Sequence, residues 1–177
     1  MRLVQAGDTA QLATLFERHH LALFRYLLQL SRNRALSEDL VQEVFFRVLK
    51  YSGSYDPSLS FTVWLYRMAR NAYFDSLRSQ RPETTDTGLT EIRSAAPMPE
   101  EILTTKQDST FLREALQKLS EDKREVLVLS RFQNLRYQEI ALILKCEVGT
   151  VKVRVYRALK ELREKFCELR GEKLYDI

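Results

Sequence analysis

The chain has 177 residues, and its 28 Lys and Arg against 24 Asp and Glu give a formal net charge of +4. Hydrophobic residues make up 45% and charged residues 29% of the chain, a globular balance that excludes wholesale disorder. Five Gly and four Pro are too few for a turn-rich β-sandwich. No apolar run approaches the roughly 18 residues of a membrane span, and the N-terminus lacks the apolar run of a signal peptide. We therefore expect a cytoplasmic protein with no membrane insertion.

Residues that could hold a metal or carry out catalysis are few. Two cysteines, Cys146 and Cys167, and two histidines are too few for a disulfide framework or a zinc site. The spacing Glu17-x-x-His20 suits one half of a di-iron site, but the second such motif is missing. A phosphate-binding glycine loop and a nucleophile elbow are missing as well. We expect no cofactor, no metal and no enzymatic activity.

The charge is divided unevenly along the chain. Residues 1–80 carry a net charge of +3, residues 81–108 carry −3, and residues 109–177 carry +4. The middle segment holds three of the four prolines and shows no sustained apolar periodicity, which is typical of a linker. We therefore predict two small helical domains, 1–80 and 109–177, joined by a flexible linker over 81–108.

The first block predicts three helices. Apolar residues recur at three- and four-residue steps over 12–30, which predicts an amphipathic helix of about six turns. Ser37 is a suitable N-cap for a second helix, because acidic residues follow it in the first turn. A loop over 51–58 contains Gly and Pro, and Ser60 then caps a third helix that ends near Ser79.

The third helix has two different faces. Its buried side is predicted to consist of Phe61, Leu65, Met68, Ala69, Ala72 and Leu77. Another face carries basic, amide and aromatic side chains at helical spacing: Arg67, Arg70, Asn71, Phe74, Arg78 and Arg81, with Trp64, Tyr66 and Tyr73 nearby. Rings bind bases and guanidinium groups bind phosphates, so this pattern suits single-stranded nucleic acid. A core helix with buried aromatics and solvated arginines is the alternative, and the loop tyrosines Tyr51 and Tyr55 favour base binding slightly.

The second block predicts a helix-turn-helix. After a helix over 111–119 and another capped by Ser120, a short helix over 137–144, a tight turn and a longer helix over 150–170 follow. The small side chain of Ala141 allows the two helices to cross closely, and Thr150 is placed to cap the longer one.

The outer face of the longer helix predicts DNA binding. Opposite its apolar stripe lie the residues that would enter a major groove: Val153, Tyr156, Arg157 and Lys160, with Lys152 and Arg154 at the edges. Ordinary scaffolding is the alternative, since helical hairpins with basic outer faces also serve that role.

Three blocks of sequence together carry a resemblance to a known family. The segments 39–45 (DLVQEVF), 61–71 (FTVWLYRMARN), and 137–141 with 148–152 (YQEIA and VGTVK) resemble those of bacterial RNA polymerase sigma factors. The small extracytoplasmic-function (ECF) group of the sigma-70 family, which keeps only regions 2 and 4, is the most similar. The resemblance covers roughly 10–80 and 109–168, and it implies an all-α fold with a region 2 bundle and a region 4 helix-turn-helix domain.

The resemblance also implies protein partners. In the family, the helix that matches 39–45 docks on the coiled coil of the polymerase β′ subunit, which points here to Asp39, Gln42, Glu43, Phe46 and Arg47. A solvated acidic first turn is the alternative for this segment. The helices over 111–131 would include the surface that docks on the polymerase β flap. A separate anti-sigma protein would restrain the chain.

Promoter contacts follow from the same resemblance. The resemblance implies that region 2 captures a flipped-out base and holds the opened −10 strand through Tyr55, Trp64 and Asn71. The basic and aromatic face of the third helix adds Arg67, Arg70, Phe74 and Arg78 to the predicted −10 contacts. Region 4 would read the −35 element as duplex through Thr150, Lys152, Val153, Arg154, Tyr156, Arg157 and Lys160.

The chain departs from the family pattern at several positions. Val153 replaces a small hydroxyl residue, and an apolar side chain there prefers a thymine methyl group, so we hypothesise a thymine at this −35 contact. Asp56 follows Tyr55 where a Phe-Arg pair is common, which leaves the −10 base preference open. Lys145 stands where a turn glycine is common, and a left-handed conformation there would cost about 1 kcal/mol.

Two other functions are compatible with a helix-turn-helix. One is a duplex-binding transcriptional regulator whose first block is a helical sensor or dimerisation domain. The other is a helical adaptor that binds only proteins. The face with arginines and aromatics on the third helix favours the sigma factor, because a protein that binds only duplex DNA has no use for it.

Overall fold

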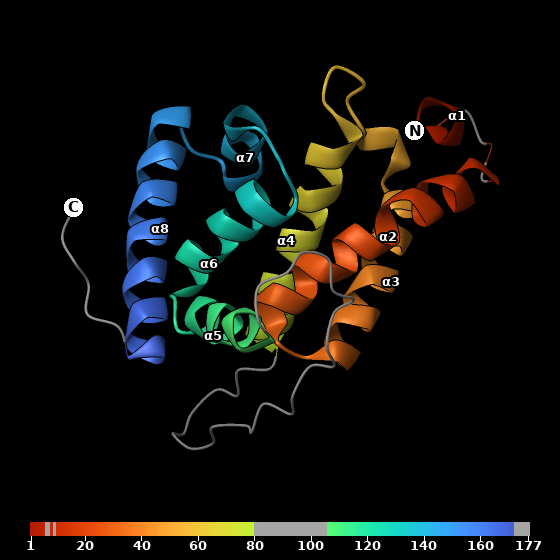
Figure 1. The fold of residues 1–177 in the computed structure, drawn as a ribbon. Coiled ribbons are helices and arrows are strands. Elements are labelled where there is room, and N and C mark those ends of the chain that lie inside the picture. The colour runs from red at the N-terminus through yellow and green to blue at the C-terminus, as the bar shows by residue number, and fades with distance from the viewer. Residues whose placement is uncertain (6–7, 9, 80–105, 172–177) are drawn as a thin grey trace. The chain divides into compact units, whose positions relative to one another are not determined.

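Helices form every regular element of the residues that the computed structural model describes, which are 1–5, 8, 10–79 and 106–171 (Figure 1). Contacts divide the chain into two compact units. One unit holds α1 to α4, and the other holds α5, α6, η2, α8 and most of α7. The predicted all-α class with two helical domains is confirmed. Most of the predicted linker lies outside the described residues, and its last three residues belong to α5.

The first unit is built on three long helices. Its elements are α1 (Arg2–Gln5), α2 (Ala10–Ser31), α3 (Arg34–Lys50), the 3₁₀ turn η1 (Ser52–Ser54) and α4 (Phe61–Ser79). Helices α2, α3 and α4 pack against one another, as the orange and yellow ribbons of Figure 1 show. The fully buried side chains of these helices include Leu23, Tyr26, Leu27, Val44, Val48, Val63, Leu65 and Ala69. Their burial supplies the main stabilisation of this unit.

The predicted N-cap of the second helix is wrong. Helix α3 begins at Arg34, and the side chain of Asn33 accepts a hydrogen bond of 3.1 Å from the backbone N–H of Leu36. Ser37 lies inside the helix and is fully buried, where its hydroxyl donates to the carbonyl oxygen of Asn33 at 2.7 Å. Both Asn and Ser are good cap residues, so the sequence alone could not separate the two positions.

The buried face of α4 differs in part from the predicted one. The buried residues are Val63, Leu65, Tyr66, Ala69, Ala72 and Tyr73. Tyr66 meets the ring of Tyr26 edge-on at 5.0 Å between ring centroids, and burial raises the pKa of Tyr66. The hydroxyl of Tyr73 donates to the carbonyl oxygen of Leu30 at 3.2 Å. For Tyr66 and Tyr73, which the sequence placed near the nucleic-acid face, the structure has the alternative of buried aromatics, because a tyrosine can fill a core position when its hydroxyl finds a partner.

The second unit is organised around its last helix. Its elements are α5 (Lys106–Gln117), α6 (Glu121–Leu127), the π-helical turn η2 (Val128–Phe132), α7 (Tyr137–Leu144) and α8 (Val148–Arg170). Helix α8 packs on α5 and α6, and two ion pairs reinforce these contacts. Lys123 of α6 pairs with Glu161 of α8, and Asp108 of α5 lies 3.6 Å from Nε of Arg170.

A buried charged residue closes the end of α5. Arg124 is 5% exposed, and its Nη2 donates to the carbonyl oxygens of Leu119 at 2.9 Å and Gln117 at 3.4 Å. The last carbonyls of a helix lack partners within the helix, so a guanidinium group placed there satisfies them. Glu125 beside it is also buried. Neither residue stood out in the sequence, because charged residues are usually exposed.

Candidate nucleic-acid and polymerase-binding surfaces

The turn between α7 and α8 is tight and uses a left-handed residue. Lys145 ends α7 with φ 53° and ψ 49°, and the N–H of Cys146 donates to the carbonyl oxygen of Ala141 at 3.0 Å. Asn134, before α7, is also left-handed with φ 51°. At the start of α7 the carboxylate of Glu139 accepts a hydrogen bond of 2.9 Å from the backbone N–H of Arg136. These contacts define the predicted helix-turn-helix.

Helix α8 begins earlier than predicted. Glu147 occupies the N-cap position with extended backbone, and its carbonyl oxygen accepts the N–H of Val151 at 3.1 Å. Thr150 is therefore the third residue of the helix, and the prediction that it caps α8 is wrong. Gly149 lies within the first turn without breaking it. The exposed side chain of Thr150 lies beside the first N–H groups of the helix, where a phosphate can bind.

One face of α8 is presented to solvent as a continuous surface. Val151, Val155 and Ala158 are buried, and all seven residues predicted to read the −35 element are exposed: Thr150, Lys152, Val153, Arg154, Tyr156, Arg157 and Lys160. Val153 is 47% and Tyr156 71% exposed, so this side of the helix offers an aliphatic and an aromatic side chain as well as basic ones. None of the four basic residues in this set forms an ion pair with another described residue. We call this set the α8 face.

A second candidate surface lies on α4. Arg70, Asn71, Phe74, Asp75 and Arg78 line a shallow pocket. The guanidinium carbon of Arg70 lies 4.7 Å from the centre of the Phe74 ring, a cation–π contact that holds both side chains on the same side of the helix. Asn71, which lines the same pocket, is exposed. The structure thus brings together four predicted −10 contacts, and adds a carboxylate, Asp75, that the sequence interpretation did not include.

The aromatic residues around the loop before α4 form a cluster. Tyr55 is 8% exposed, its hydroxyl donates to the carbonyl oxygen of Leu59 at 2.7 Å, and its ring lies 5.2 Å from that of Trp64. Phe61 contacts both rings. In this structure Tyr55 and Trp64 thus shape the loop, and their predicted contacts with DNA stay predictions. Burial of Tyr55 could not be read from the sequence, because loop residues are usually exposed.

Asp56, next to the buried Tyr55 in this loop, is exposed. Its carboxylate accepts a hydrogen bond of 2.8 Å from the backbone N–H of Ser58, and this bond, with that from the Ser58 hydroxyl, lowers the pKa of Asp56. The carboxylate is therefore charged at neutral pH and lies where the family pattern commonly has an arginine.

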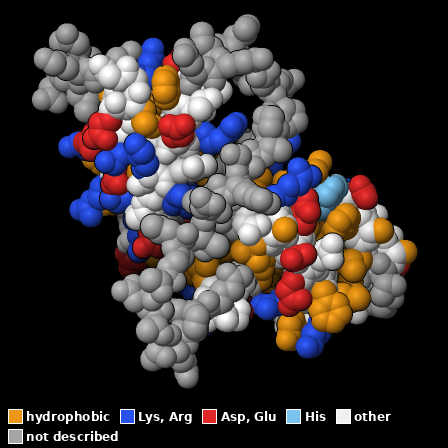
Figure 2. Space-filling model, turned by 90° about the horizontal axis from the view of Figure 1, so that it is seen from below, with side chains coloured by type: hydrophobic (Ala, Val, Ile, Leu, Met, Phe, Trp, Pro, Cys, Tyr) orange, Lys and Arg blue, Asp and Glu red, His pale blue; other side chains and the backbone are white. Residues whose placement is uncertain are grey.

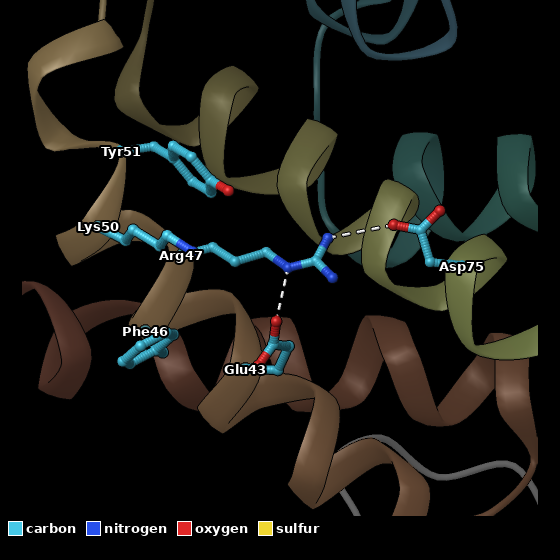
Figure 3. Close-up of a pocket in the computed structure, with 6 residues that line it drawn as sticks. All are labelled: Glu43, Phe46, Arg47, Lys50, Tyr51 and Asp75. Atoms are coloured by element: carbon cyan, nitrogen blue, oxygen red, sulfur yellow. Dashed lines mark hydrogen bonds and ion pairs between the residues drawn. The ribbon is translucent and has the colours of Figure 1, made fainter. Parts of the chain in front are cut away.

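A third surface surrounds the second half of α3. Asp39, Gln42, Glu43 and Phe46 are exposed, and Arg47 is half-buried. A pocket here is lined by Glu43, Phe46, Arg47, Lys50, Tyr51 and Asp75, with Arg47 across its centre (Figure 3). We call these six residues the α3 pocket. Lys50 and Tyr51 were missed, although Lys50 follows Glu43 and Phe46 at helical spacing. Asp75 was missed because it comes from α4.

Arg47 is held from two sides. Its Nε donates to Oε1 of Glu43 at 2.7 Å and its Nη1 donates to Oδ2 of Asp75 at 3.2 Å (Figure 3). The hydrogen bond to Glu43, followed by that to Asp75, raises the pKa of Arg47. Phe46 beside it is 61% exposed. An arginine held in place by two ion pairs, next to a largely exposed aromatic ring, is typical of a protein-binding surface.

Among the described residues, no helix combines the length and the apolar composition that a membrane span requires. Within 1–5, 8, 10–79 and 106–171, no group of three or more His, Cys, Asp and Glu side chains is arranged to hold a metal ion.

The family of the chain follows from comparison with known proteins. Residues 15–83 match the Sigma-70 region 2 family, and residues 112–162 match the Sigma-70 region 4 family. The region 2 match lies on the first unit and includes the α3 pocket and the α4 surface. The region 4 match lies on the second unit and includes the α8 face. The chain therefore belongs to the sigma-70 family of RNA polymerase sigma factors, and with the relatives below it falls in the extracytoplasmic-function (ECF) group.

Individual relatives are similar over nearly their whole length. The chain is 35% identical over 161 residues to the RNA polymerase sigma factor CarQ of Myxococcus xanthus, covering 89% of this chain and 90% of CarQ. It is 30% identical over 179 residues to the ECF RNA polymerase sigma factor SigW of Bacillus subtilis (strain 168), covering 96% of each. A chain in the co-crystal structure of the sigma factor RpoE with the anti-sigma factor NepR from Bartonella quintana matches with a TM-score of 0.72 and 28% identity, over 90% of this chain and 96% of that chain.

Membership of this group means that the protein is an alternative sigma factor, which directs transcription initiation. The predicted resemblance is confirmed. The alternative of a transcriptional regulator with an N-terminal sensor or dimerisation domain is not favoured, because region 2 occupies the first unit.

Proposed function

We propose that the first unit docks on core RNA polymerase through the α3 pocket and holds the opened −10 strand against α4. The second unit reads the −35 element as duplex DNA through the α8 face. The observation that carries this proposal is the exposure of all seven predicted −35 residues on one side of α8, opposite its buried side.

The α8 face suits the major groove of duplex DNA. A B-DNA major groove is about 12 Å wide and admits one helix. The guanidinium groups of Arg154 and Arg157 can each bind a guanine through two hydrogen bonds, at about 1–3 kcal/mol of discrimination. Lys152 precedes these two arginines on α8 and Lys160 follows them, and the ammonium groups of both can neutralise phosphates.

The α4 surface suits an opened strand. The side-chain amide of Asn71 both donates and accepts, so it can bind the edge of an unpaired base. Extruding a base costs a few kcal/mol, and stacking on an aromatic ring returns about 1–3 kcal/mol per base. Phe74, held by Arg70, supplies such a ring, while Arg67 and Arg78 supply charge for phosphates.

The α3 pocket suits a protein partner. Phe46 is an exposed aromatic anchor, and charged groups of Glu43, Arg47 and Lys50 surround it. Interfaces commonly place a desolvated aromatic anchor within a polar rim. We infer that the partner is core polymerase, with the β′ coiled coil on this surface and the β flap on residues 111–131, as the family resemblance implies.

Charge also favours action on the polymerase rather than alone. On the face that Figure 2 shows, described Lys and Arg side chains lie among Asp and Glu side chains. Phosphate neutralisation supplies most non-specific DNA affinity, so a chain with this balance binds DNA weakly by itself. We infer that the protein acts in the cytoplasm as a polymerase subunit and that the polymerase supplies the chemistry. We also infer that a separate anti-sigma protein restrains it, because the sigma factor RpoE is in complex with the anti-sigma factor NepR in the matching structure.

In vitro transcription with core polymerase, with and without this protein, tests the proposal on a library of randomised promoters. We expect initiation at defined promoters only when the protein is present, and the proposal is wrong if no promoter-dependent start appears.

Phe46→Ala should weaken binding to core polymerase by about ten-fold, as loss of an aromatic anchor does. Leu21→Ala is the matched control, because Leu21 is 58% exposed on α2, outside the α3 pocket.

A further inference from the structure

The N-terminal helix reaches the loop that precedes α4. Gln5, the last residue of α1, donates from Nε2 to the carbonyl oxygen of Ser52 at 3.0 Å and to that of Tyr55 at 2.9 Å. The two acceptors lie 47 and 50 residues away along the chain. One amide nitrogen has two hydrogens, so both are used on the loop.

Helix α1 is itself fixed to the first unit. Val4 is 4% exposed, so it anchors the helix in the core. The N–H of Asp8 donates to the carbonyl oxygen of Leu3 at 3.0 Å, and the Asp8 carboxylate accepts the N–H of Ala10 at 3.2 Å, at the first turn of α2. Gln5 therefore extends from an anchored segment.

The loop's own hydrogen bonds determine its local shape. The N–H of Ser54 donates to the carbonyl oxygen of Tyr51 at 2.9 Å, and the N–H of Tyr55 donates to that of Ser52 at 3.2 Å. These bonds close the turn η1 but do not connect it to another element. The bonds from Gln5 connect the turn to α1, and so restrict the movement of the loop as a body.

We propose that Gln5 is a positioning residue for −10 recognition, which holds the loop 51–60 in the conformation that meets the opened strand. This inference rests on the proposed function, in which the loop and α4 bind the −10 element. Gln5 lies outside residues 15–83, which match region 2, so the contact adds a determinant from outside that region. Specificity at a base edge depends on placement to a fraction of an ångström, so a released loop reads the strand less selectively.

Two variants of Gln5 test the proposal in the holoenzyme. Gln5→Met keeps the length of the side chain and removes both donors, whereas Gln5→Glu also places a carboxylate against two carbonyl oxygens. We expect open-complex formation to fall at least about five-fold in Gln5→Met, because one net hydrogen bond corresponds to about that factor and two are removed, and further in Gln5→Glu. The base preference at −10 in a randomised promoter library should broaden in both. Binding to −35 duplex should not change.

Leu3→Ala is the matched control, because Leu3 is 57% exposed on the same helix. It should leave open-complex formation and the −10 preference as in the unmodified chain. Thermal unfolding of each variant, together with its affinity for core polymerase, separates a positioning role from destabilisation of the first unit, since a fold defect there lowers polymerase docking and −10 binding together. The inference is overturned if Gln5→Met, folded as judged by this measurement, opens promoters with the rate and base preference of the unmodified chain.

A loop variant separates failure of this inference from failure of the proposed function. Asp56→Ala changes an exposed loop side chain and should alter the −10 preference. If Asp56→Ala alters the preference and both Gln5 variants do not, Gln5 has no positioning role. If none of the three variants alters it, the loop does not bind the −10 strand, and the proposed function of the loop fails with the inference.

Discussion

Arg47 of α3 and Asp75 of α4 form an ion pair with 3.2 Å between Nη1 and Oδ2, and the other Asp75 oxygen lies 3.6 Å from Nη1 of Arg78. One carboxylate thus joins the α3 pocket, proposed to bind polymerase, to an arginine proposed to bind the −10 strand. Arg47 is 28% and Asp75 49% exposed at the side chain. Solvent screens such partly exposed ion pairs, so their contribution to the free energy of unfolding is small. Their effect on the binding of polymerase and of the −10 strand beside them is therefore the better quantity to measure.

Replacement of Asp75 by Asn tests this relationship. We expect the free energy of unfolding to fall by less than about 1 kcal/mol, because the ion pairs are partly exposed. Affinity of the holoenzyme for a fork DNA with an opened −10 strand should rise, because a negative charge beside Arg78 is removed. Urea unfolding and fluorescence anisotropy measure the two effects. Glu168→Gln, which breaks an exposed ion pair on α8, is the control and should leave fork binding unchanged. Weaker fork binding by Asp75→Asn would contradict the assignment of Arg78.

Asn71→Ala should impair promoter opening more than promoter binding. Loss of the amide removes hydrogen bonds to an unpaired base, which corresponds to about a three- to ten-fold fall in open complexes. Affinity for −35 duplex should stay within about two-fold, because no contact with duplex is removed. Permanganate footprinting measures opening and anisotropy measures duplex affinity. Ser79→Ala, at the exposed end of α4, is the control. An equal loss of both activities would argue against a specific role for Asn71.

Val153→Ser should change the base preference at one −35 position. The Val153 side chain is 47% exposed on the α8 face, where its methyl groups can contact a thymine methyl group. A hydroxyl group in its place donates and accepts hydrogen bonds, so we expect the preference for thymine to weaken by roughly 1 kcal/mol or more. A promoter library randomised at −35 measures the preference. The thymine hypothesis is wrong if the variant shows an unchanged preference at every position.

Lys145→Gly should stabilise the protein. Lys145 is left-handed, with φ 53° and ψ 49°, a conformation that costs a residue with a Cβ roughly 1–2 kcal/mol. The greater freedom of glycine in the unfolded chain offsets part of this gain, so we expect the free energy of unfolding to rise by about 0.5–1 kcal/mol. Lys145→Ala is the control, because it removes the side chain but keeps the strain. Equal stability of the two variants in urea would show that the turn stores no such strain.

Stability should decrease as the pH falls below neutral. Burial, and then the nearby charge of Arg18, lowers the pKa of His19 from its ordinary value of 6.5. The unfolded chain therefore binds a proton at His19 more readily than the folded chain, so this contribution to stability is present above pH 6.5 and is lost as the pH falls below it. Urea midpoints at about pH 7.5 and pH 5.5 measure the change. In His19→Gln the decrease should be smaller, and an unchanged decrease would assign it to other groups.

Much of the fold and of the α8 face was predictable from the sequence. The apolar positions of α2 and α8 recur at helical steps, and this periodicity is a local property that needs no knowledge of neighbouring elements. On α8 it placed Val151 and Val155 inside and six of the seven predicted −35 residues outside, as the structure has them; Thr150 joined that set through the family resemblance. The turn that follows α7 was also predicted from the sequence, and in the structure α7 ends at Lys145 in the left-handed region.

The faces of α4 were harder to assign, because both carry aromatic residues. Tyr66 and Tyr73 are as compatible with a stacking surface as with a core, and only packing against α2 made them core residues. Tyr55 was expected to face DNA, yet its ring packs on Trp64 and Phe61. Spacing cannot decide such cases, since a tyrosine is apolar in its ring and polar at its hydroxyl.

The amino-acid sequence by itself determined that this protein is a two-domain helical sigma factor. It also determined which side of α8 is exposed to solvent. Both follow from the sequence because helical periodicity and family motifs depend only on residues that are near one another along the chain. Only the tertiary structure decided the contacts between residues far apart along the chain. It brought Asp75 of α4 beside Arg47 of α3, and Gln5 of α1 against the carbonyl oxygens of Ser52 and Tyr55. A hydrogen bond of that kind depends on where separate helices pack, and that is determined by the shared core rather than by any local pattern.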